Sequence, residues 1–451
     1  MTNYWSTDWL GTNPVFFNTK TKKVSHNIND VIDIENLEFD AQGLNNYLRY
    51  SYSVFGQTPI KNVKFLLPNS ALSIENGEFV IHKKEDPADK YFGKISKEED
   101  VLADISSAVK SWESSIKGDI TIPTSGGYDS RILNLMVGDK SRIRSFTYGI
   151  SRKQEESFEI VYAKKFCESQ NIKWQSINLG EFNRYNDEWY DIYGVSTGTF
   201  GTYHIEFYNK IKSVLQDEQL NLLSGIVGDA WAGAINKKPI NNIDDVILLG
   251  HSHGVSIDKR HFKLKSDNNL EEQFWQENKE KLQEHYYQII QLVRFKMIFL
   301  SYLLKVPQHL GFNAWSPFVK EEICCAMMNI SQERRADRLW QKEFFRKHGA
   351  NVEEDSSLKA KKSNYLDLYS MYKTPLKPLD SRLLSRIVDE KYVESINKNL
   401  YSGFYPKRFL QYNFLSKDEN KQKHLNAYNA YTLLKPIEIL LARQQGLIKI
   451  R

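Results

Sequence analysis

Residues 120–136 read Ile120-Thr121-Ile122-Pro123-Thr124-Ser125-Gly126-Gly127-Tyr128-Asp129-Ser130-Arg131-Ile132-Leu133-Asn134-Leu135-Met136. The first five residues predict a short buried strand, and the run from Arg131 predicts the start of a helix. Between them, two adjacent glycines let the backbone turn tightly and approach a ligand without a Cβ in the way. The free N–H groups of the loop and of the helix N-terminus converge on one point, which favours binding of a phosphate or pyrophosphate.

The loop at 125–130 carries the pattern S-G-G-x-D-S. Asp129 is a poor direct contact for an anion, but its carboxylate would hold a Mg2+ ion that neutralises the phosphates. The pattern resembles the pyrophosphate loop of ATP-pyrophosphatase enzymes and lacks the G-x-x-x-x-G-K of kinase-type loops, which implies cleavage between the α and β phosphates of ATP. The alternatives are a chance match in a turn of Ser and Gly, and a helix cap at Asp129. The strand before the loop and the helix after it argue against a chance match.

Strands and helices alternate after this loop. The expected strands are at 119–124, 143–148, 174–177 and 220–223, and the expected helices begin at Asp129, span 155–169 and lie near 203–216. This alternation predicts an α/β fold with a doubly wound parallel sheet covered on both faces. Ligands of such sheets bind beyond the carboxyl ends of the strands, where the glycine loop lies. After about residue 265 we expect mostly helix.

The chain before the glycine loop has a different character. We expect a small, mainly β domain at 1–95, followed by a second domain at 96–451. Short strand-like runs on either side of Glu75-Asn76-Gly77-Glu78 predict a hairpin. A helix should begin near residue 96, with Ser96 as its cap and Glu99 completing a capping box.

The composition is that of an ordinary globular protein, with 41% hydrophobic and 26% charged residues among 451. There are three cysteines, an odd number with two of them adjacent, which argues against a disulfide framework and for a reducing compartment. The N-terminus shows neither the basic nor the apolar region of a signal peptide. The most apolar run, 289–306, contains Gln, Arg and Lys residues. We therefore expect a cytoplasmic protein without a membrane span.

Basic residues are concentrated near the C-terminus. The net charge is +5, and the segment 356–451 holds 18 Lys and Arg against 8 Asp and Glu. The first interpretation is a solvated helical surface. The second is a docking surface for an acidic partner, such as a polyanionic glycan, a carrier protein, tRNA or the inner membrane surface.

A second glycine loop lies 100 residues after the first. Ser224-Gly225-Ile226-Val227-Gly228-Asp229 again follows an expected strand and again combines glycines with an acid. Carboxylates at the ends of neighbouring strands could share one Mg2+ ion, so Asp129 and Asp229 are the expected metal ligands. Alone the second turn is a weak signal, but with the first loop it forms the expected second half of a site. His251-Ser252-His253 has no carboxylate or cysteine spaced to complete a metal site, and we expect an ordinary loop there.

With these two loops the chain resembles the asparagine synthetase family, whose synthetase domain carries S-G-G-x-D-S and later S-G-x-G-x-D-E. The resemblance covers about residues 40–440 and implies an adenine nucleotide α-hydrolase-like fold, with the synthetase domain at 96–451 and a degenerate glutaminase-like domain at 1–95. Four further segments match family motifs in the same order. The family's S-F strand, which lies near the adenine, is matched by Ser145-Phe146-Thr147-Tyr148-Gly149, and its E-x-x-x-A helix is matched by Glu159 and Ala163. Its E-A-R-V-P-F-L-D segment is matched by Asn313-Ala314-Trp315-Ser316-Pro317-Phe318-Val319-Lys320, and its K-x-x-L-R helix by Lys342-Glu343-Phe344-Phe345-Arg346.

The resemblance and the loop chemistry together assign roles to single residues. Asp129 and Asp229 would hold Mg2+, and Lys342 would stabilise negative charge as a carboxylate attacks the α-phosphorus. The alternative for Lys342 is a surface lysine on a helix. Arg131 could meet a substrate carboxylate, although we expect it to be exposed to solvent. The expected ATP-binding residues are Ser125, Gly126, Gly127, Asp129, Ser130, Phe146, Gly225 and Gly228.

This chain departs from the family pattern at positions that the family uses to supply ammonia and to bind the substrate other than ATP. The family's glutaminase needs a cysteine directly after the initiator methionine, where this chain has Thr2, and no cysteine precedes Cys167. We therefore expect no glutaminase activity, a retained adenylation site and a rebuilt substrate pocket that does not take aspartate. The other changed positions are Ala230, in place of the Glu after the second Asp, and Asn313, Trp315 and Lys320, in place of E, R and D.

The function implied by the resemblance is that of an asparagine synthase-like, AMP-forming carbon–nitrogen ligase. Mg2+ and ATP would adenylate a carboxylate with release of pyrophosphate, and the acyl group would pass to ammonia or an amine. The expected partners are a small-molecule or glycan carboxylic acid, an amine or ammonia donor, and a separate glutaminase or acidic carrier, in surface-polysaccharide or natural-product biosynthesis. We expect neither a nucleic-acid partner nor a membrane span. The alternatives are a tRNA-modifying adenylating enzyme, suggested by the basic C-terminal segment, and a catalytically decayed ATP-binding scaffold.

Overall fold

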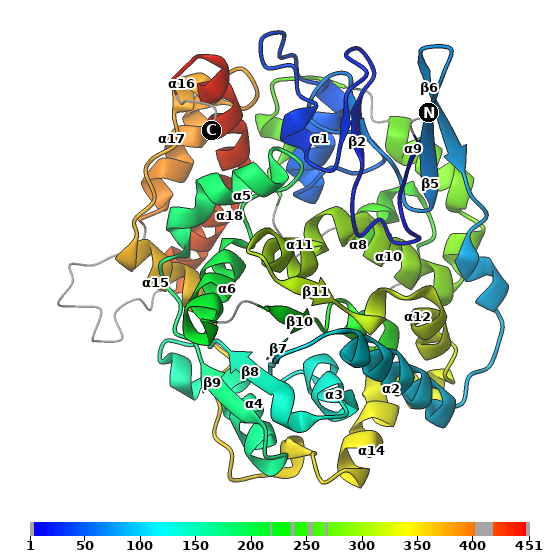
Figure 1. The fold of residues 1–451 in the computed structure, drawn as a ribbon. Helices are drawn as coiled ribbons and strands as arrows, with labels where there is room; N and C mark the ends of the chain where they lie inside the picture. The colour runs from blue at the N-terminus through cyan, green and yellow to red at the C-terminus, as the bar shows by residue number, and fades with distance from the viewer. Residues whose placement is uncertain are drawn as a thin grey trace.

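The computed structural model describes residues 4–216, 219–235, 240–250, 256–266, 269–401 and 418–447, with side chains from residue 422 onward in the last range. The loop expected at 251–253 and part of the basic C-terminal segment lie outside these ranges. The described chain is a mixed α/β structure in which a five-stranded parallel sheet lies among helices (Figure 1). The alternation of strands and helices predicted this class of fold.

The parallel sheet places the two glycine loops side by side. Its strand order is β11-β10-β7-β8-β9, and every neighbouring pair is parallel. From β7 the chain builds outward through β8 and β9, then returns to the other side of β7 for β10 and β11. The order therefore reverses between β7 and β10, and such a switch point leaves a crevice at the carboxyl ends of the strands. The strands are β7 (Ile120–Pro123), β8 (Ile143–Thr147), β9 (Lys173–Ser176), β10 (Asn221–Leu223) and β11 (Asn313–Trp315).

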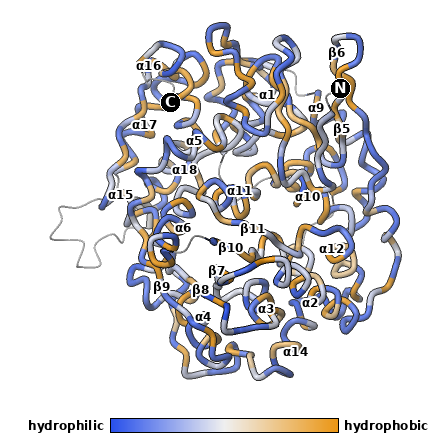
Figure 2. The backbone as a smooth tube through the Cα atoms, in the orientation of Figure 1, coloured by the Kyte–Doolittle hydropathy of each residue, from blue (hydrophilic) through white to orange (hydrophobic). Residues whose placement is uncertain are grey.

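Helices cover both faces of this sheet. In Figure 1, α3 and α4 lie below the strands with α2 beside α3, and α6 and α11 lie above them. The strand residues between these layers, such as Ile120, Ile122 and Leu222, are fully buried. Figure 2 shows hydrophobic stretches through the interior of the molecule and mostly hydrophilic outer turns. The covering helices are α2 (Glu98–Ser115), α3 (Tyr128–Met136), α4 (Phe158–Ser169), α6 (Thr202–Leu215) and α11 (Tyr302–His309).

The N-cap of helix α2 lies one residue after the predicted N-cap, Ser96. Its N-cap is Lys97, with no side-chain cap hydrogen bond, so the capping box predicted for Ser96 and Glu99 is wrong. The amide of Ser96 instead donates to the carbonyl of Asn329 at 3.0 Å, which ties this residue to another element. Three acidic residues in the first turn, 98–100, complement the helix dipole in place of a cap.

The N-terminal part contains two small antiparallel sheets and one helix. The predicted hairpin is present, with Glu75 opposite Glu78 at its turn. This part packs tightly on the rest of the chain: Trp9 stacks on Trp231 with 5.8 Å between ring centroids, and one continuous hydrophobic core runs from Trp9 to Ala442. The sheets have the orders β1-β5-β6 and β3-β2-β4, and the elements are β1 (Tyr4–Ser6), β2 (Phe16–Asn18), β3 (Val24–Ser25), α1 (Ala41–Tyr50), β4 (Val63–Phe65), β5 (Ser70–Glu75) and β6 (Glu78–Lys83).

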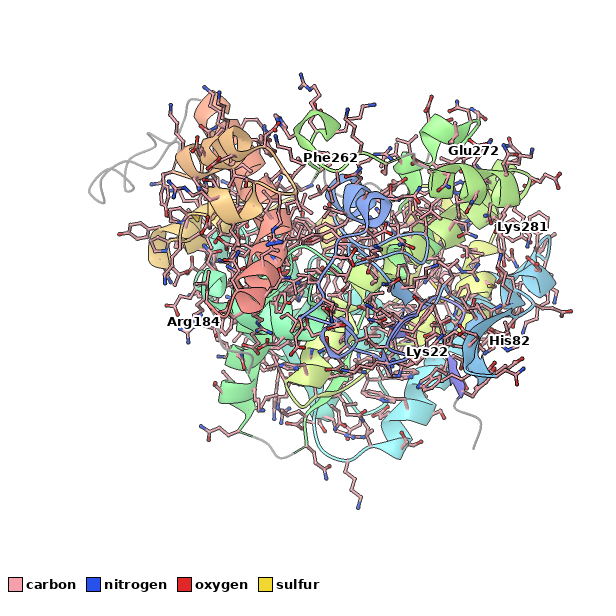
Figure 3. The ribbon with its side chains drawn as sticks, turned by 90° about the horizontal axis from the view of Figure 1, so that it is seen from above. Lys22, His82, Arg184, Phe262, Glu272 and Lys281 are labelled. Carbon is pink, nitrogen blue, oxygen red and sulfur yellow. The ribbon has the colours of Figure 1, made fainter. Side chains whose placement is uncertain are left out.

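The chain after residue 265 is mostly helical, as predicted. The apolar run at 289–306 is divided between α10 and α11, and no helix among the described residues is long and apolar enough to cross a membrane. All three cysteines are free and buried. Charged side chains such as Arg184, Glu272 and Lys281 lie at the outer edge of the molecule (Figure 3). The remaining helices are α5 (Asn186–Tyr193), α7 (Gly228–Ala232), α8 (Ile247–Gly250), α9 (Asn269–Asn278), α10 (His285–Leu300), α12 (Glu321–Met328), α13 (Gln332–Arg335), α14 (Leu339–Lys347), α15 (Leu366–Lys373), α16 (Ser381–Leu384), α17 (Glu390–Asn399) and α18 (Asp418–Gln444).

Candidate functional site

The two glycine loops leave the adjacent strands β7 and β10 and pack against each other. A Cβ added to Gly228 would lie 2.9 Å from Cγ of Asp129 and 2.9 Å from Cδ2 of Phe318. A Cβ added to Gly225 would lie 3.3 Å from the amide nitrogen of Ser130. Glycine at these positions therefore permits the close approach of the two loops. The structure brings together the predicted residues of the first loop and those of the second.

The first loop is held in shape by its own serines. The amide of Ser125 donates to Oγ of Ser130 at 2.9 Å, and the amide of Gly127 donates to Oγ of Ser125 at 3.1 Å. Helix α3 follows directly, and its N-cap Gly127 provides no side-chain cap. The N–H groups of the first helical turn have no partner within the helix, so they are free to bind an anion.

Arg131 is buried beneath this loop, so its expected exposure to solvent is wrong. Its side chain is 0% exposed and forms an ion pair with Glu353. Its Nε donates to the carbonyl of Gly127 at 3.1 Å, and its guanidinium lies 5.0 Å from the ring centroids of both Tyr128 and Phe345. Two of the residues that cover Arg131, Phe345 and Glu353, lie more than 200 positions further along the chain, where no local pattern connects them to it.

Asp129 lies where the two loops meet and is electrostatically unsatisfied. Its Oδ1 is buried without a hydrogen-bond partner. Burial, and then the neighbouring Asp229 carboxylate, raise the pKa of Asp129 well above its usual value, while Arg338 and Gln341 act in the opposite direction. Gln341 is itself fully buried and faces Asp129, and neither of its amide atoms makes a hydrogen bond of good geometry. Unpaired buried polar groups of this kind point to a ligand that completes them.

The acidic pair fits a magnesium ion. Asp229 is exposed beside the buried oxygen of Asp129, and its own Oδ1 accepts a hydrogen bond from the amide of Ala230 at 3.0 Å. Within the described ranges, no group of three or more His, Cys, Asp or Glu side chains is placed to hold a metal. Mg2+ is suited to such a site because it is commonly bound through one or two carboxylates together with phosphate oxygens and water.

Backbone strain occurs at both sides of the site. Val227 in the second loop has a φ of 51°, and Asp337 and Arg338 before α14 have φ values of 49° and 56°. A left-handed conformation at a β-branched residue costs about 1–3 kcal/mol and is concentrated at functional sites. The strained turn places the Arg338 guanidinium 4.7 Å from the ring centroid of Tyr128. Sequence reasoning missed Arg338 and Gln341, although both lie within four residues before the predicted Lys342.

Lys342 is not brought onto the loops. Its ammonium pairs with Asp337, whose side chain is 85% exposed. Lys342 is on α14, which also carries two residues that contact the first loop and its helix. Gln341 lowers the pKa of Asp129, and the ring of Phe345 covers Arg131. Its predicted role in charge stabilisation stays a prediction.

The other predicted residues, Phe146 and the segment 313–320, lie in or directly after strands of the parallel sheet. Phe146 is buried within β8, and its carbonyl accepts a hydrogen bond from the amide of Thr124 at 2.8 Å. Trp315 ends β11 and stacks on Trp112 of α2 with 5.3 Å between ring centroids. Phe318 packs on Gly228 and so supports the second loop. The segment 313–320 therefore contributes packing at the sheet edge.

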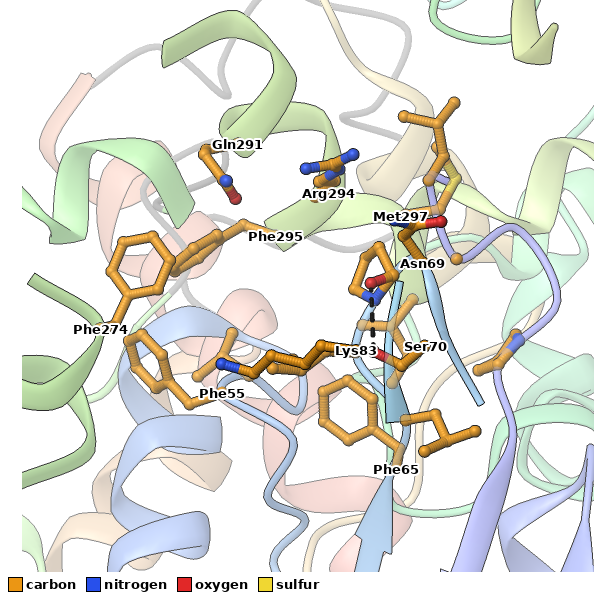
Figure 4. A pocket seen from close by; sticks show the side chains of 18 of the residues that line it. Phe55, Phe65, Asn69, Ser70, Lys83, Phe274, Gln291, Arg294, Phe295 and Met297 are labelled. Atoms are coloured by element: carbon orange, nitrogen blue, oxygen red, sulfur yellow. Dashed lines mark hydrogen bonds between the residues drawn. The ribbon is translucent and has the colours of Figure 1, made fainter. Parts of the chain in front are cut away.

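The described residues line two sizeable cavities, of which one lies at the parallel sheet. The first, here named the sheet-edge cavity, has a volume of about 370 Å³ and lies beyond the carboxyl end of β8. The second, of about 390 Å³, lies between the N-terminal part and helices α9 and α10, away from both glycine loops (Figure 4). The sheet-edge cavity is lined by Ser51, Tyr52, Tyr148, Ile150, Glu159, Phe200, Tyr203, Phe299, Asn364, Leu366, Asp367, Tyr428 and Asn429.

Comparison with known proteins adds no assignment: no protein-family model matches this chain, and a search of curated proteins finds no match.

Proposed function

We propose that this protein is an AMP-forming amide ligase that resembles asparagine synthetase. The observation that carries the proposal is the meeting of two glycine loops at the switch point of a parallel sheet, with the unpaired Oδ1 of Asp129 buried between them. Parallel sheets of this kind bind nucleotides at the switch point. The proposal includes the adenine nucleotide α-hydrolase-like fold and an N-terminal glutaminase-like part that lacks the catalytic cysteine.

The first loop and α3 would bind the pyrophosphate of ATP. The uncapped N-terminus of α3 offers free N–H groups and the positive end of the helix dipole. Glycine at position 126 lets the loop pack closely against α4, because a Cβ there would lie 2.5 Å from Cε1 of Phe158. The hydroxyls of Ser125 and Ser130 accept hydrogen bonds from loop amides and so fix the loop shape. They would also be available to bound phosphates.

Asp129 and Asp229 would hold the magnesium ion, which when bound neutralises charge on the phosphates. Asp129 must lose its proton to do so, because only the carboxylate binds a cation. The raised pKa of Asp129 in the ligand-free protein means that cation binding displaces this proton.

The chemistry proposed is two displacements. A substrate carboxylate oxygen attacks the α-phosphorus of ATP, an O–P bond forms, and the P–O bond to pyrophosphate breaks. A neutral amine nitrogen then attacks the acyl carbon, a C–N bond forms, the C–O bond to AMP breaks, and the nitrogen releases a proton to water. Arg338, which already acts on Asp129, and Lys342 are the cations available to stabilise negative charge in the first step.

The experiment that tests the proposal is ATP–pyrophosphate exchange with Mg2+ and pooled carboxylic acids. Exchange should require one acid pool and fall at least about 100-fold in Asp129→Asn, as expected for loss of a group that stabilises developing charge. The matched control is Asp139→Asn, an exposed aspartate near the end of α3, which should retain exchange.

Three other outcomes would change the assignment. Lack of exchange with every pool, together with no ATP binding by calorimetry, would indicate the scaffold alternative. ATP binding without exchange would mean that the correct acid was missing from the pools. RNA that copurifies and dissociates steeply with salt would favour the tRNA-modifying alternative.

A further inference from the structure

The sheet-edge cavity adjoins the loop that would bind ATP. Tyr148, which lines it, directly follows β8, the neighbour of β7 in the sheet. Glu159, which also lines it, lies in the first turn of α4, next to Phe158, whose ring contacts the position of Gly126. A compound in this cavity would therefore lie beside the nucleotide site, where a second substrate has to bind.

The lining of this cavity is aromatic and acidic. Its walls include the rings of Tyr148 and Tyr203, which meet edge to face with 5.8 Å between centroids, and also Tyr52, Phe200 and Tyr428. Its only ionisable groups besides the tyrosines are two carboxyls, and the described lining residues include no Lys, Arg or His. A cavity of this charge repels carboxylates and phosphates and attracts cations.

Neither of the two carboxyls, Glu159 and Asp367, has a cationic partner in the described chain. Oε2 of Glu159 is buried without a hydrogen bond, and no positive charge acts on the buried carboxyl of Asp367. Burial raises the pKa of Glu159, and it raises the pKa of Asp367 to about 6. Behind the tyrosine wall, His204 offers no compensating charge, because burial lowers its pKa to about 3. A buried carboxylate without a partner is costly, and a cationic or hydroxyl-bearing ligand would relieve that cost.

We infer that this cavity binds the acceptor amine of the ligase, and that the acceptor is a hydroxylated primary amine of the amino-sugar class. This inference rests on the proposed function. An ammonium group would pair with one carboxylate and lie against tyrosine faces, while hydroxyls would donate to the other carboxylate. A cavity of about 370 Å³ is of the size that holds a small organic molecule and is far larger than ammonia needs.

The test is calorimetric titration of the full chain with D-glucosamine, without ATP or Mg2+, above the pKa of about 6 that burial gives Asp367. Glucosamine should bind, and N-acetyl-D-glucosamine, which has the same ring without the cation, should bind at least about tenfold more weakly. Glu159→Gln and Asp367→Asn should each weaken glucosamine binding by a similar factor. Both substitutions preserve size, and circular dichroism would verify that the variants fold.

The matched control is Glu168→Gln, at the exposed far end of α4, which should bind glucosamine like the unaltered protein. The inference is overturned if glucosamine does not bind, if the acetylated sugar binds equally well, or if both cavity variants bind glucosamine normally. It is also overturned if adenosine binds and requires Glu159 and Asp367, because the cavity would then be the nucleoside site.

The result is separable from a failure of the proposed function. Acid-dependent ATP–pyrophosphate exchange should persist in the two cavity variants, since the adenylation step does not use the amine. Amine binding without exchange in the unaltered protein would refute the ligase and leave an amine-binding site. Exchange without amine binding would support adenylation and refute the assignment of this cavity.

Discussion

The size of single side chains sets how closely the first glycine loop approaches the ring of Phe158. Gly126 lies directly over the ring of Phe158, so that an added Cβ would lie 2.5 Å from Cε1. Gly127, the next residue, has an ordinary φ of −77°, and its nearest neighbour to an added Cβ is Oγ of Ser125 at 3.2 Å. The two glycines are adjacent in sequence, yet only the first is confined by a rigid aromatic ring.

Substitution of Gly126 by Ala should therefore lower the free energy of unfolding by about 1–3 kcal/mol, the usual cost of overpacking. Gly127→Ala should cost less, because a hydroxyl can move more easily than a ring. Urea unfolding would measure both. The double variant Gly126→Ala with Phe158→Leu should recover most of the loss, and the same cost for both single variants would contradict this explanation.

The raised pKa of Asp129 predicts how stability changes with pH. Between about pH 4, near the usual pKa of an aspartate, and the raised pKa, the native protein holds a proton that the unfolded chain has lost. The contribution of Asp129 to the free energy of unfolding therefore falls as pH rises through this range. Asp129→Asn removes this contribution, so the variant should gain stability relative to the unaltered protein as pH rises. Urea unfolding in EDTA at two pH values would check this, and the opposite trend would refute the raised pKa.

At the scale of elements, Arg131 connects α3 to the segment that follows α14. Its guanidinium is fully buried, pairs with Glu353 and binds the carbonyl of Gly127. A nearby pair, Arg346 with Glu354, has the same charges, but both side chains are more than half exposed. The two pairs therefore differ mainly in burial.

Arg131→Met should destabilise the protein by about 3 kcal/mol or more, because it removes a fully buried guanidinium and with it the contacts to Glu353 and to the Gly127 carbonyl. Arg346→Met should cost at most about 1 kcal/mol, as exposed pairs do. Arg131→Lys should recover only part of the loss, since an ammonium cannot reproduce the forked contacts of a guanidinium. Thermal and urea unfolding would rank the three variants, and equal effects at positions 131 and 346 would contradict the role assigned to burial.

The strained turn before α14 makes a separate prediction about ligand binding. Arg338→Gly keeps the left-handed conformation at 56° without strain and removes the cation over Tyr128. Its stability should change by less than about 1 kcal/mol, the size of a glycine effect. Under the proposed function, binding of Mg2+ and ATP should weaken about tenfold, because the variant lacks a cation proposed to stabilise the phosphates. Calorimetric titration with ATP and Mg2+ would compare the affinities of the variant and the unaltered protein. An unchanged affinity for ATP would show that Arg338 acts only within the ligand-free protein.

At the scale of the whole molecule, the N-terminal part and the parallel-sheet part share one core. Nε1 of Trp9 donates to the carbonyl of Val319 at 2.8 Å, and the hydroxyl of Tyr47 donates to the carbonyl of Leu433 at 2.9 Å. Arg294 binds both Asp86 and the carbonyl of Trp9. The N-terminal part also supplies Ser51 and Tyr52 to the sheet-edge cavity.

The two parts should therefore unfold together. Trp9→Ala should lower the free energy of unfolding by about 3–5 kcal/mol, the range for loss of a large aromatic from a core. Tryptophan fluorescence and far-ultraviolet circular dichroism should report one coincident transition, and a fragment of residues 96–451 should not show a cooperative transition of its own. Two separate transitions, or a stable fragment, would contradict a shared core.

Sequence reasoning predicted the elements whose signals are local. The strand, glycine loop and helix at 120–136 lie within one or two residues of their predicted bounds. Strand β11, by contrast, has three residues, 313–315, which is too short for an apolar period to be recognised. The cap of α2 was mispredicted because Asn329 holds Ser96, and the burial of Arg131 was missed because Phe345 and Glu353 cover it.

The sequence by itself determined the glycine loops, the alternation of strands and helices, and the acidic residues at the strand ends. These depend on neighbours a few positions away, through glycine conformation, apolar periodicity and the order of residues. Only the tertiary structure decided that the second loop closes on Asp129, that Arg338 and Gln341 act on it, and that Glu159 and Asp367 share an aromatic cavity. Such features arise where residues far apart in the chain pack together and exclude water, and no local pattern records that contact.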